Sequence, residues 1–218
     1  MKLHHFLALA LALFAFAAGN ASAQDAAEDK SVALYNGKDL TGWNTTGNWV
    51  VEPDGVLAII PREGEEGWKR YDAYLTTERK YADFEITLDY QHDKGGNSGL
   101  YFCIQDDADP VKTGIEIQIL DSHGKADDEL THHDNGGIIK TSPAKVNASK
   151  PAGEWNTLKA RLVGTHLKAW LNGKLIHDLD LAEHDATKGH AAAGSGYVSL
   201  QDHGLEMRFR NIRITELK

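Results

Sequence analysis

The 218-residue chain has few of the residues that build crosslinked or basic proteins. Its single cysteine, Cys103, excludes an intrachain disulfide framework and a cysteine-rich zinc module. Lys and Arg are outnumbered 23 to 32 by Asp and Glu and form no cluster, which argues against nucleic acid or an anionic membrane surface as a partner. With only five prolines and no Pro- or Ser-rich linker, the chain is expected to form one domain that acts on a small, uncharged molecule.

A long hydrophobic run occurs only near the start, at residues 6–18, and it is too short to span a bilayer. Lys2 precedes this run and Ala21-Ser22-Ala23 follows it, a pattern typical of a cleaved secretory signal. We therefore predict a signal peptide at residues 1–23, a flexible leader at 24–30 and a single domain at 31–218. The mature protein is expected to be periplasmic or secreted, with no membrane attachment after cleavage.

Helical periodicity is nearly absent, and short alternating runs bounded by Gly, Asn and Asp predict an all-β protein. The clearest expected strands are 84–90, 99–104, 114–120, 155–163, 166–171, 197–201 and 207–214. Asn172-Gly173 predicts a type I′ hairpin turn, because both residues tolerate positive φ. So many short antiparallel strands indicate a sandwich or a closed barrel, and the clean alternation of core and polar faces favours the sandwich.

This alternation also predicts a polar sheet surface. In 114–120, three isoleucines face one way, so Glu116 and Gln118 face the other. In 197–203, Gln201 and His203 share the face opposite the core side chains. In 99–104, Tyr101 and Cys103 are expected to alternate with Leu100, Phe102 and Ile104. A carboxylate, amides, a phenol and an imidazole on one surface would suit a sugar-binding groove.

The order of the motifs along the chain makes this prediction more specific. They are Leu34-Tyr35-Asn36-Gly37-Lys38-Asp39-Leu40-Thr41-Gly42-Trp43, Gly96-Asn97-Ser98-Gly99, Glu116-Ile117-Gln118-Ile119-Leu120-Asp121, Leu171-Asn172-Gly173-Lys174, Leu200-Gln201-Asp202-His203-Gly204 and Phe209-Arg210-Asn211-Ile212. Over roughly residues 31–217 the chain resembles the 3-keto-disaccharide hydrolase domain family. The resemblance implies a concanavalin-like jelly-roll sandwich of two antiparallel sheets, with the ligand on the concave face.

The resemblance further implies that the substrate is a glycoside already oxidised to a ketone at C3. The ketone acidifies the hydrogen on C2, a base removes it, and the enolate expels the aglycone from C1. Water then adds to the glycal-like product, which completes a net hydrolysis. The implied functional partner is a glycoside 3-dehydrogenase that makes the keto substrate.

Candidate roles follow from the faces and the resemblance together. Glu116 is the first choice for the general base, and His203 is a candidate acid or base because imidazole titrates near neutral pH. The expected substrate-binding residues are Asn97, Tyr101, Gln118, Asp121, Lys140 and Gln201. Strict alternation puts Asp121 on the wrong face, so its role requires a β-bulge near Leu120.

Three points stay open at this stage. In the family the strand after Asn-Ser-Gly often ends in Arg where this chain has Cys103, which leaves specificity and activity in question. The motifs specify no cofactor, and a divalent metal ion stays an alternative for stabilising the enolate. Two other functions share the expected fold: a non-catalytic carbohydrate-binding module and a retaining laminarinase-type endoglucanase, the latter with Gln118 and Asp121 replacing two of its usual acids.

Overall fold

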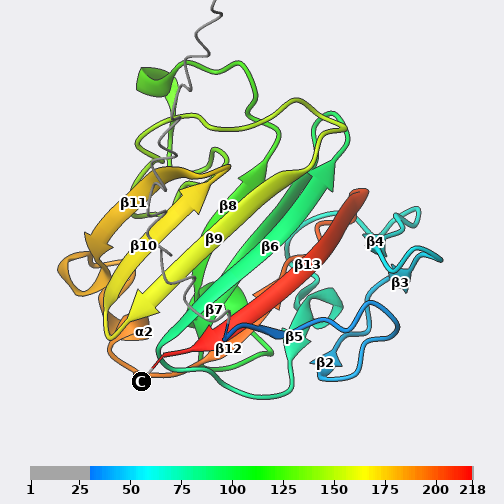
Figure 1. Cartoon of the computed structure of the whole chain (residues 1–218), viewed down its shortest axis with the longest axis horizontal. Coiled ribbons are helices and arrows are strands. Elements are labelled where there is room, and N and C mark those ends of the chain that lie inside the picture. Colours follow the sequence, from blue (N-terminus) through cyan, green and yellow to red (C-terminus); the bar gives the residue numbers. More distant parts are fainter. Residues whose placement is uncertain (1–29, 218) are drawn as a thin grey trace, which may run out of the picture.

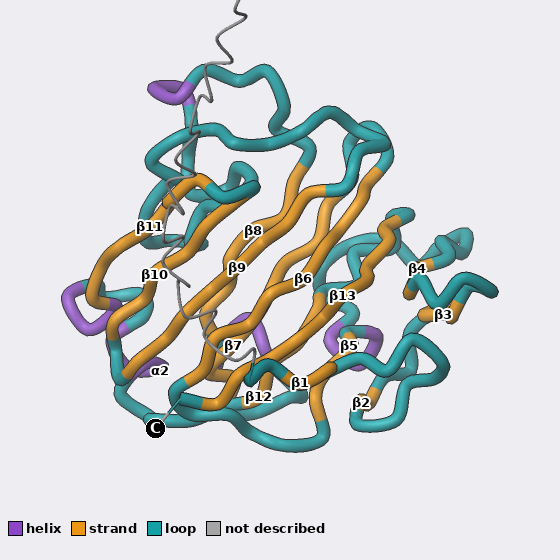
Figure 2. Tube along the Cα trace, in the orientation of Figure 1, coloured by secondary structure: helices purple, strands orange, loops and turns teal. Residues whose placement is uncertain are grey.

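The computed structural model describes residues 30–217 of the chain. The predicted signal peptide lies outside the described residues, as does all of the predicted leader except Lys30. Within residues 30–217, no helix is long and apolar enough to cross a membrane. The described part consists mainly of strands and loops, and its helices are single short turns (Figure 2).

Two antiparallel sheets pack face to face, with the larger one in front in Figure 1. The eight-stranded sheet has the order β11-β10-β9-β6-β13-β4-β3, and β1 pairs with β13. Its strands are β1 (Val32–Ala33), β3 (Trp49–Val51), β4 (Leu57–Ile59), β6 (Phe84–His92), β9 (Asn156–Val163), β10 (His166–Leu171), β11 (Lys174–Asp180) and β13 (Met207–Glu216). The five-stranded sheet has the order β2-β5-β12-β7-β8. Its strands are β2 (Trp43–Asn44), β5 (Leu75–Thr77), β7 (Asn97–Ile104), β8 (Ile115–Leu120) and β12 (Tyr197–Leu200).

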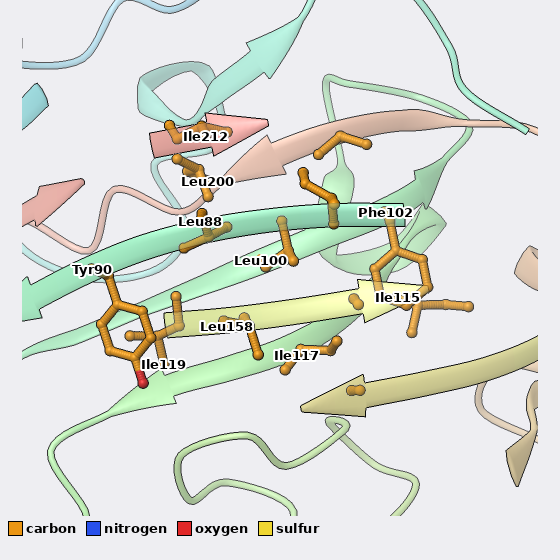
Figure 3. Close-up of a cluster of buried hydrophobic side chains, with 14 of the residues drawn as sticks. Leu88, Tyr90, Leu100, Phe102, Ile115, Ile117, Ile119, Leu158, Leu200 and Ile212 are labelled. Carbon is orange, nitrogen blue, oxygen red and sulfur yellow. The ribbon is translucent and has the colours of Figure 1, made fainter. Parts of the chain in front are cut away.

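The core lies between the two sheets, where the inward-facing side chains of both interdigitate. Figure 3 shows Leu88 and Leu158 of the larger sheet near Leu100 and Ile117 of the smaller one. All four side chains are buried. The alternation read from the sequence therefore gives the correct faces for these four residues, and the predicted jelly-roll sandwich is confirmed.

Two short helices contact the smaller sheet. The helix α1 (Pro110–Thr113) begins after Asp109, whose side chain accepts a hydrogen bond from the Lys112 amide. The helix α2 (Lys188–Ala191) and α1 both contact β7. The 3₁₀ turns of the described chain are Tyr71–Ala73, Asp127–Glu129 and Leu181–Glu183.

The alternation predicted for 99–104 is wrong at its end, because β7 contains a bulge at Cys103. Cys103 has a φ of 56°, and the register between β7 and β12 shifts here. Its side chain consequently joins the main core beside Phe102, while Ile104 turns to the Tyr101 side. A Cβ on Gly196 would come within 2.3 Å of the Cys103 backbone, so glycine is needed there for the close approach.

Other local predictions have mixed outcomes. The Asn172-Gly173 turn between β10 and β11 has positive φ at both residues, 49° and 77°, as the type I′ prediction requires.

The strands β1 to β5 are not among the strands that the sequence predicts most clearly. Each has only two or three residues, which is too short to show alternation.

Candidate functional site

A pocket of about 360 Å³ lies on the face of the smaller sheet that points away from the core. Its lining residues are Trp68, Asn97, Tyr101, Val111, Glu116, Gln118, His133, Ile139, Lys140, Gln201 and His203. Strands β7 and β8 form its floor, because the alternate residues of both strands fill the core. The volume is within the range of roughly 300–1,000 Å³ that is typical of small-molecule sites.

Seven of the eight residues proposed from sequence line this pocket: Glu116, His203, Asn97, Tyr101, Gln118, Lys140 and Gln201. The eighth, Asp121, does not reach it. Strands β7 and β8 pair continuously from Asn97 opposite Leu120 to Phe102 opposite Ile115. The β-bulge near Leu120 that would bring Asp121 to the pocket face is therefore not formed. Asp121 Oδ2 instead accepts a hydrogen bond of 2.9 Å from the Gly95 amide at the turn before β7.

Glu116 is the central ionisable group of the pocket. Only 8% of the residue is exposed, and burial raises its pKa to about 7. The Tyr101 hydroxyl donates a hydrogen bond of 2.6 Å to Oε2 and partly offsets this rise, whereas Oε1 has no partner among the described residues. A buried carboxylate with one oxygen held and the other unpaired is an arrangement suited to taking a proton from a bound ligand.

Gln201 connects this carboxylate to the rim of the pocket. Its Nε2 donates to the Tyr74 hydroxyl at 2.7 Å and to the Tyr101 hydroxyl at 3.4 Å. The Tyr74 hydroxyl in turn donates to the carbonyl oxygen of Trp68 at 2.7 Å. The amide orientation leaves Oε1 of Gln201, which is 3% exposed, without a partner in the described structure. The pocket thus contains two unpaired buried oxygens that would accept hydrogen bonds from sugar hydroxyls.

A second amide pair lies farther along the floor. Gln118 Nε2 donates to Asn97 Oδ1 at 3.0 Å, across the β7–β8 ladder. This contact fixes both amides in the pocket. The remaining Asn97 amide hydrogens and the Gln118 carbonyl oxygen are then free to bind hydroxyl groups.

One wall is a loop that binds to the edge of β8. The Gln118 amide donates to Gly137 O, the Gly136 amide donates to Gln118 O, and the Ile139 amide donates to Glu116 O. These bonds bring His133 and Lys140 to the pocket. Lys140 has a φ of 60°, and its amide donates to His132 Nδ1 at 3.0 Å.

The opposite wall is a strap at residues 61–70. Arg70 bonds to the buried Asp202 carboxylate at 3.2 Å and to Glu65 at 3.0 Å. The Gly67 amide also donates to His203 O at 3.0 Å. The strap thereby holds the His203 turn, and burial lowers the pKa of the His203 imidazole below its ordinary value. Burial thus favours the neutral form of this imidazole.

Sequence reasoning missed four lining residues: Trp68, Val111, His133 and Ile139. They belong to loops or to the short helix α1, whose position depends on tertiary contacts rather than on a periodic pattern. Trp68 is 42% exposed, and an exposed indole beside a pocket was the one available signal. Cys103 lines no part of this pocket, so it does not occupy a ligand-contacting position.

Cys103 is also unsuited to chemistry, since burial raises the pKa of its thiol to about 12. Within residues 30–217, no group of three or more His, Cys, Asp and Glu side chains is placed to hold a metal ion. The polar side chains that line the pocket are a carboxylate, three amides, two imidazoles, the Tyr101 phenol and Lys140.

Trp68 is expected to stack on a bound sugar ring. Replacing it in Trp68→Ala should raise KM about fivefold with a small change in kcat, equivalent to a loss of about 1 kcal/mol of binding. Steady-state kinetics would show this. Trp170→Ala is the matched control, because Trp170 lies on β10 of the other sheet beside Lys159. A change in KM in both variants, or in neither, would contradict the stacking role.

Comparisons with known proteins identify the family of this chain and agree with its fold. A model of the family described as the 3-keto-alpha-glucoside-1,2-lyase-like domain matches residues 30–215. The chain is 26% identical to the 3-keto-disaccharide hydrolase of Bacteroides thetaiotaomicron, in an alignment that covers 87% of this chain and 79% of that protein.

Solved structures of other proteins have a similar fold. A proposed glycosyl hydrolase of Parabacteroides distasonis is 29% identical, with a TM-score of 0.72 over 87% of this chain and 100% of that one. The carbohydrate-binding module CBM66 of Bacillus subtilis is 20% identical, with a TM-score of 0.54 over 78% of this chain and 93% of that one. The second likeness shows the fold alone.

Proposed function

Because this chain belongs to the family of 3-keto-alpha-glucoside-1,2-lyase-like domains, we propose that it cleaves the glycosidic bond of 3-keto-glycosides. The observation that carries the proposal is the unpaired, buried Oε1 of Glu116 in a pocket lined by amides. The predicted substrate is a neutral carbohydrate, made by a glycoside 3-dehydrogenase. Consistent with the predicted signal peptide, the reaction would take place in the periplasm or outside the cell.

In the proposed reaction, Glu116 Oε1 takes the proton from C2 of the keto sugar. The electron pair of the broken C2–H bond forms the C2=C3 bond of an enolate. The enolate then re-forms the C3 ketone and a C1=C2 double bond, and the electron pair of the C1–O bond leaves with the aglycone oxygen. That oxygen takes up the proton that Glu116 removed from C2, which returns Glu116 to its ionised form. Water adds its oxygen to C1 and a proton to C2, giving the free 3-keto sugar.

Lys140 is the proposed electrophile for the enolate oxygen. It is the lysine among the residues that line the pocket, and its ammonium group can donate hydrogen bonds to a developing negative charge. Burial lowers the pKa of the His203 imidazole and so favours its neutral form. Its proposed role is therefore a hydrogen bond to the substrate or a proton relay rather than that of a permanently charged acid. A divalent metal ion remains a proposal that a chelator would test, since the reaction as written is balanced without one.

The pocket does not favour a retaining glycosidase. That mechanism needs two carboxyl groups about 5–5.5 Å apart. Among the described lining residues Glu116 is the only carboxylate, and Asp121 is bound to the Gly95 turn outside the pocket. The laminarinase alternative therefore lacks its second acid in this site.

The direct test is a turnover assay on 3-keto-trehalose, 3-keto-sucrose and a 3-keto-β-glucoside, with the unoxidised sugars beside them. We expect aglycone release from keto sugars only, with and without chelator. Binding of the same sugars without any release would contradict the proposed enzymatic activity. It would support the non-catalytic carbohydrate-binding module, the alternative that shares the fold.

The pH dependence of the rate should report the Glu116 carboxyl. A base acts only when deprotonated, and burial raises the pKa of this carboxyl to about 7. The kcat/KM should therefore rise about tenfold per pH unit below 7 and level off above it. A pH series with the keto substrate measures this. If kcat/KM instead rose with a midpoint near pH 4.5, the ordinary pKa of a Glu carboxyl, the assignment of Glu116 as the base would be contradicted.

A further inference from the structure

Lys140, the proposed electrophile, has a backbone conformation that is unfavourable for its residue type. Its φ is 60°, in the left-handed region that residues with a Cβ atom rarely adopt. The other described non-glycine residues with positive φ are Cys103, Asn172 and Asn211, which lie at a hairpin turn or at register shifts between strands, outside the pocket lining. Such a conformation persists only where the surrounding structure holds it. Lys140 therefore needs contacts that keep its backbone in place.

Hydrogen bonds from consecutive amides hold the loop at this point. The Ile139 amide donates to Glu116 O at 3.1 Å, and the amide that follows Lys140 also donates to a backbone carbonyl. The Lys140 amide between them donates instead to a side chain, at 3.0 Å from Nδ1 of His132. The imidazole of His132 is thus the acceptor that fixes the backbone at Lys140.

The His132 side chain is suited to this role by its surroundings. The preceding amide, of Thr131, donates to the buried Asp134 carboxylate at 2.7 Å and so anchors the chain beside His132. Burial, followed by the nearby His133 and Lys140, lowers the pKa of the His132 imidazole and favours its neutral form. Only a neutral imidazole has a ring nitrogen that can accept the Lys140 amide.

His132 also contacts a second residue of the pocket. The centroids of the His132 and His133 rings are 4.0 Å apart. His133 and Lys140 both line the pocket, whereas His132 does not. The contact with His133 involves the ring, and the contact with Lys140 involves one nitrogen atom. The two contacts can therefore be removed separately by substitution.

We propose that His132 is a positioning residue: by accepting the Lys140 amide, it keeps the Lys140 ammonium group in the pocket for the enolate oxygen. The inference rests on the proposed function. His132 is not a lining residue, so it acts through Lys140 rather than on the substrate. Without the acceptor, the Lys140 backbone can return to a common conformation. The direction of its Cα–Cβ bond then changes, and the ammonium group moves away from the reacting atoms.

Two substitutions separate the hydrogen bond from the ring contact. His132→Asn removes the ring but keeps an acceptor atom on Cγ, where Nδ1 is attached, whereas His132→Phe keeps a ring and has no acceptor. Both are assayed on 3-keto-trehalose. His132→Phe should lower kcat about tenfold or more, with KM within about threefold, because a displaced donor no longer stabilises the transition state. His132→Asn should keep kcat within about threefold of the wild type.

The Lys140→Met background shows whether the effect passes through Lys140. There, His132→Phe should lower kcat by less than about threefold, because the group that it positions is absent. Lys145→Met is the matched control, at an exposed lysine outside the pocket lining, and it should leave kcat unchanged. Thermal unfolding checks that the variants fold. The loop should stay in place, because its backbone bonds to Glu116 and Gln118 do not involve the His132 side chain.

The other outcomes contradict the proposal. An equal loss of kcat in His132→Asn and His132→Phe would assign the effect to the ring, and wild-type kcat in His132→Phe would show no positioning role. A full loss that persists in the Lys140→Met background, or a Lys140→Met variant as active as the wild type, would also overturn it. If His132→Phe fails to fold, His132→Leu, which also lacks an acceptor, decides in its place. A wild-type protein that cleaves no keto sugar would overturn the proposed function itself, which an active His132→Phe would leave intact.

Discussion

The variant Glu116→Gln should lose activity and gain stability at the same time. Loss of a general base typically lowers a rate by roughly 10²–10⁴, and we expect kcat on a 3-keto-glycoside to fall within this range. The glutamine keeps the shape of the side chain and an oxygen that can accept the Tyr101 hydroxyl bond. The lost rate would therefore reflect lost proton transfer rather than a disturbed pocket.

The gain in stability follows from the raised pKa of Glu116. Between about pH 4.5 and 7, the unfolded carboxyl is ionised while the folded one keeps its proton. The free energy of unfolding of the wild type consequently falls as pH rises through this window. Above the window, the loss of free energy of unfolding stays constant. A rise of the Glu116 pKa from 4.5 to about 7 lowers the free energy of unfolding by about 3 kcal/mol, because each pKa unit corresponds to about 1.4 kcal/mol.

Thermal unfolding at pH 5 and pH 8 measures this effect. Glu116→Gln should unfold roughly 5–10 °C above the wild type at pH 8 and close to it at pH 5. Glu85→Gln is the control, because Glu85 is on β6 of the other sheet and pairs with Lys159 near the surface. A Glu116→Gln protein with a rate within tenfold of the wild type, or without the pH-dependent gain, would rule out the buried base.

The alternation of β8 made the central part of this site predictable. Ile115, Ile117 and Ile119 had to fill the core, so Glu116 and Gln118 had to point away from it, and no knowledge of the neighbouring strands was needed. The same holds for Gln201 after β12. Lys140 came instead from the family resemblance, since it lies in a loop whose position depends on hydrogen bonds to the edge of β8.

The parts that could not be predicted depend on contacts between distant segments. The bulge at Cys103 forms where Gly196 lets two backbones approach closely, and alternation alone put Cys103 and Ile104 on the wrong faces. The strap at 61–70 has no periodic pattern, and the ion pair of Arg70 with Asp202, 132 positions away, holds it over the pocket. The hydrogen bond from the Tyr74 hydroxyl to Trp68 O, at 2.7 Å, also holds Trp68 at the pocket.

Gly99→Ala should abolish most of the activity although it replaces no ionisable group. A Cβ at this position would come within 2.2 Å of Glu116 Oε1 and 3.0 Å of its Cδ and Cγ. The φ of Gly99 is not in the left-handed region, so the backbone accepts alanine without strain. The added methyl group therefore moves the carboxylate, and a displaced base is expected to lower kcat about a hundredfold.

Two comparisons make this prediction specific to Glu116. Gly189→Ala is the control, because a Cβ there meets nothing within 4 Å, and it should leave the rate unchanged. In the Glu116→Gln background, Gly99→Ala should cost less than threefold, since the base that it displaces is already gone. A full hundredfold further loss in that background would show that Gly99→Ala acts on the sheet rather than on the carboxylate. The double-mutant cycle thus separates two roles of Gly99. One is to leave space for the Glu116 carboxylate, and the other is to allow β7 to pair with its neighbouring strands.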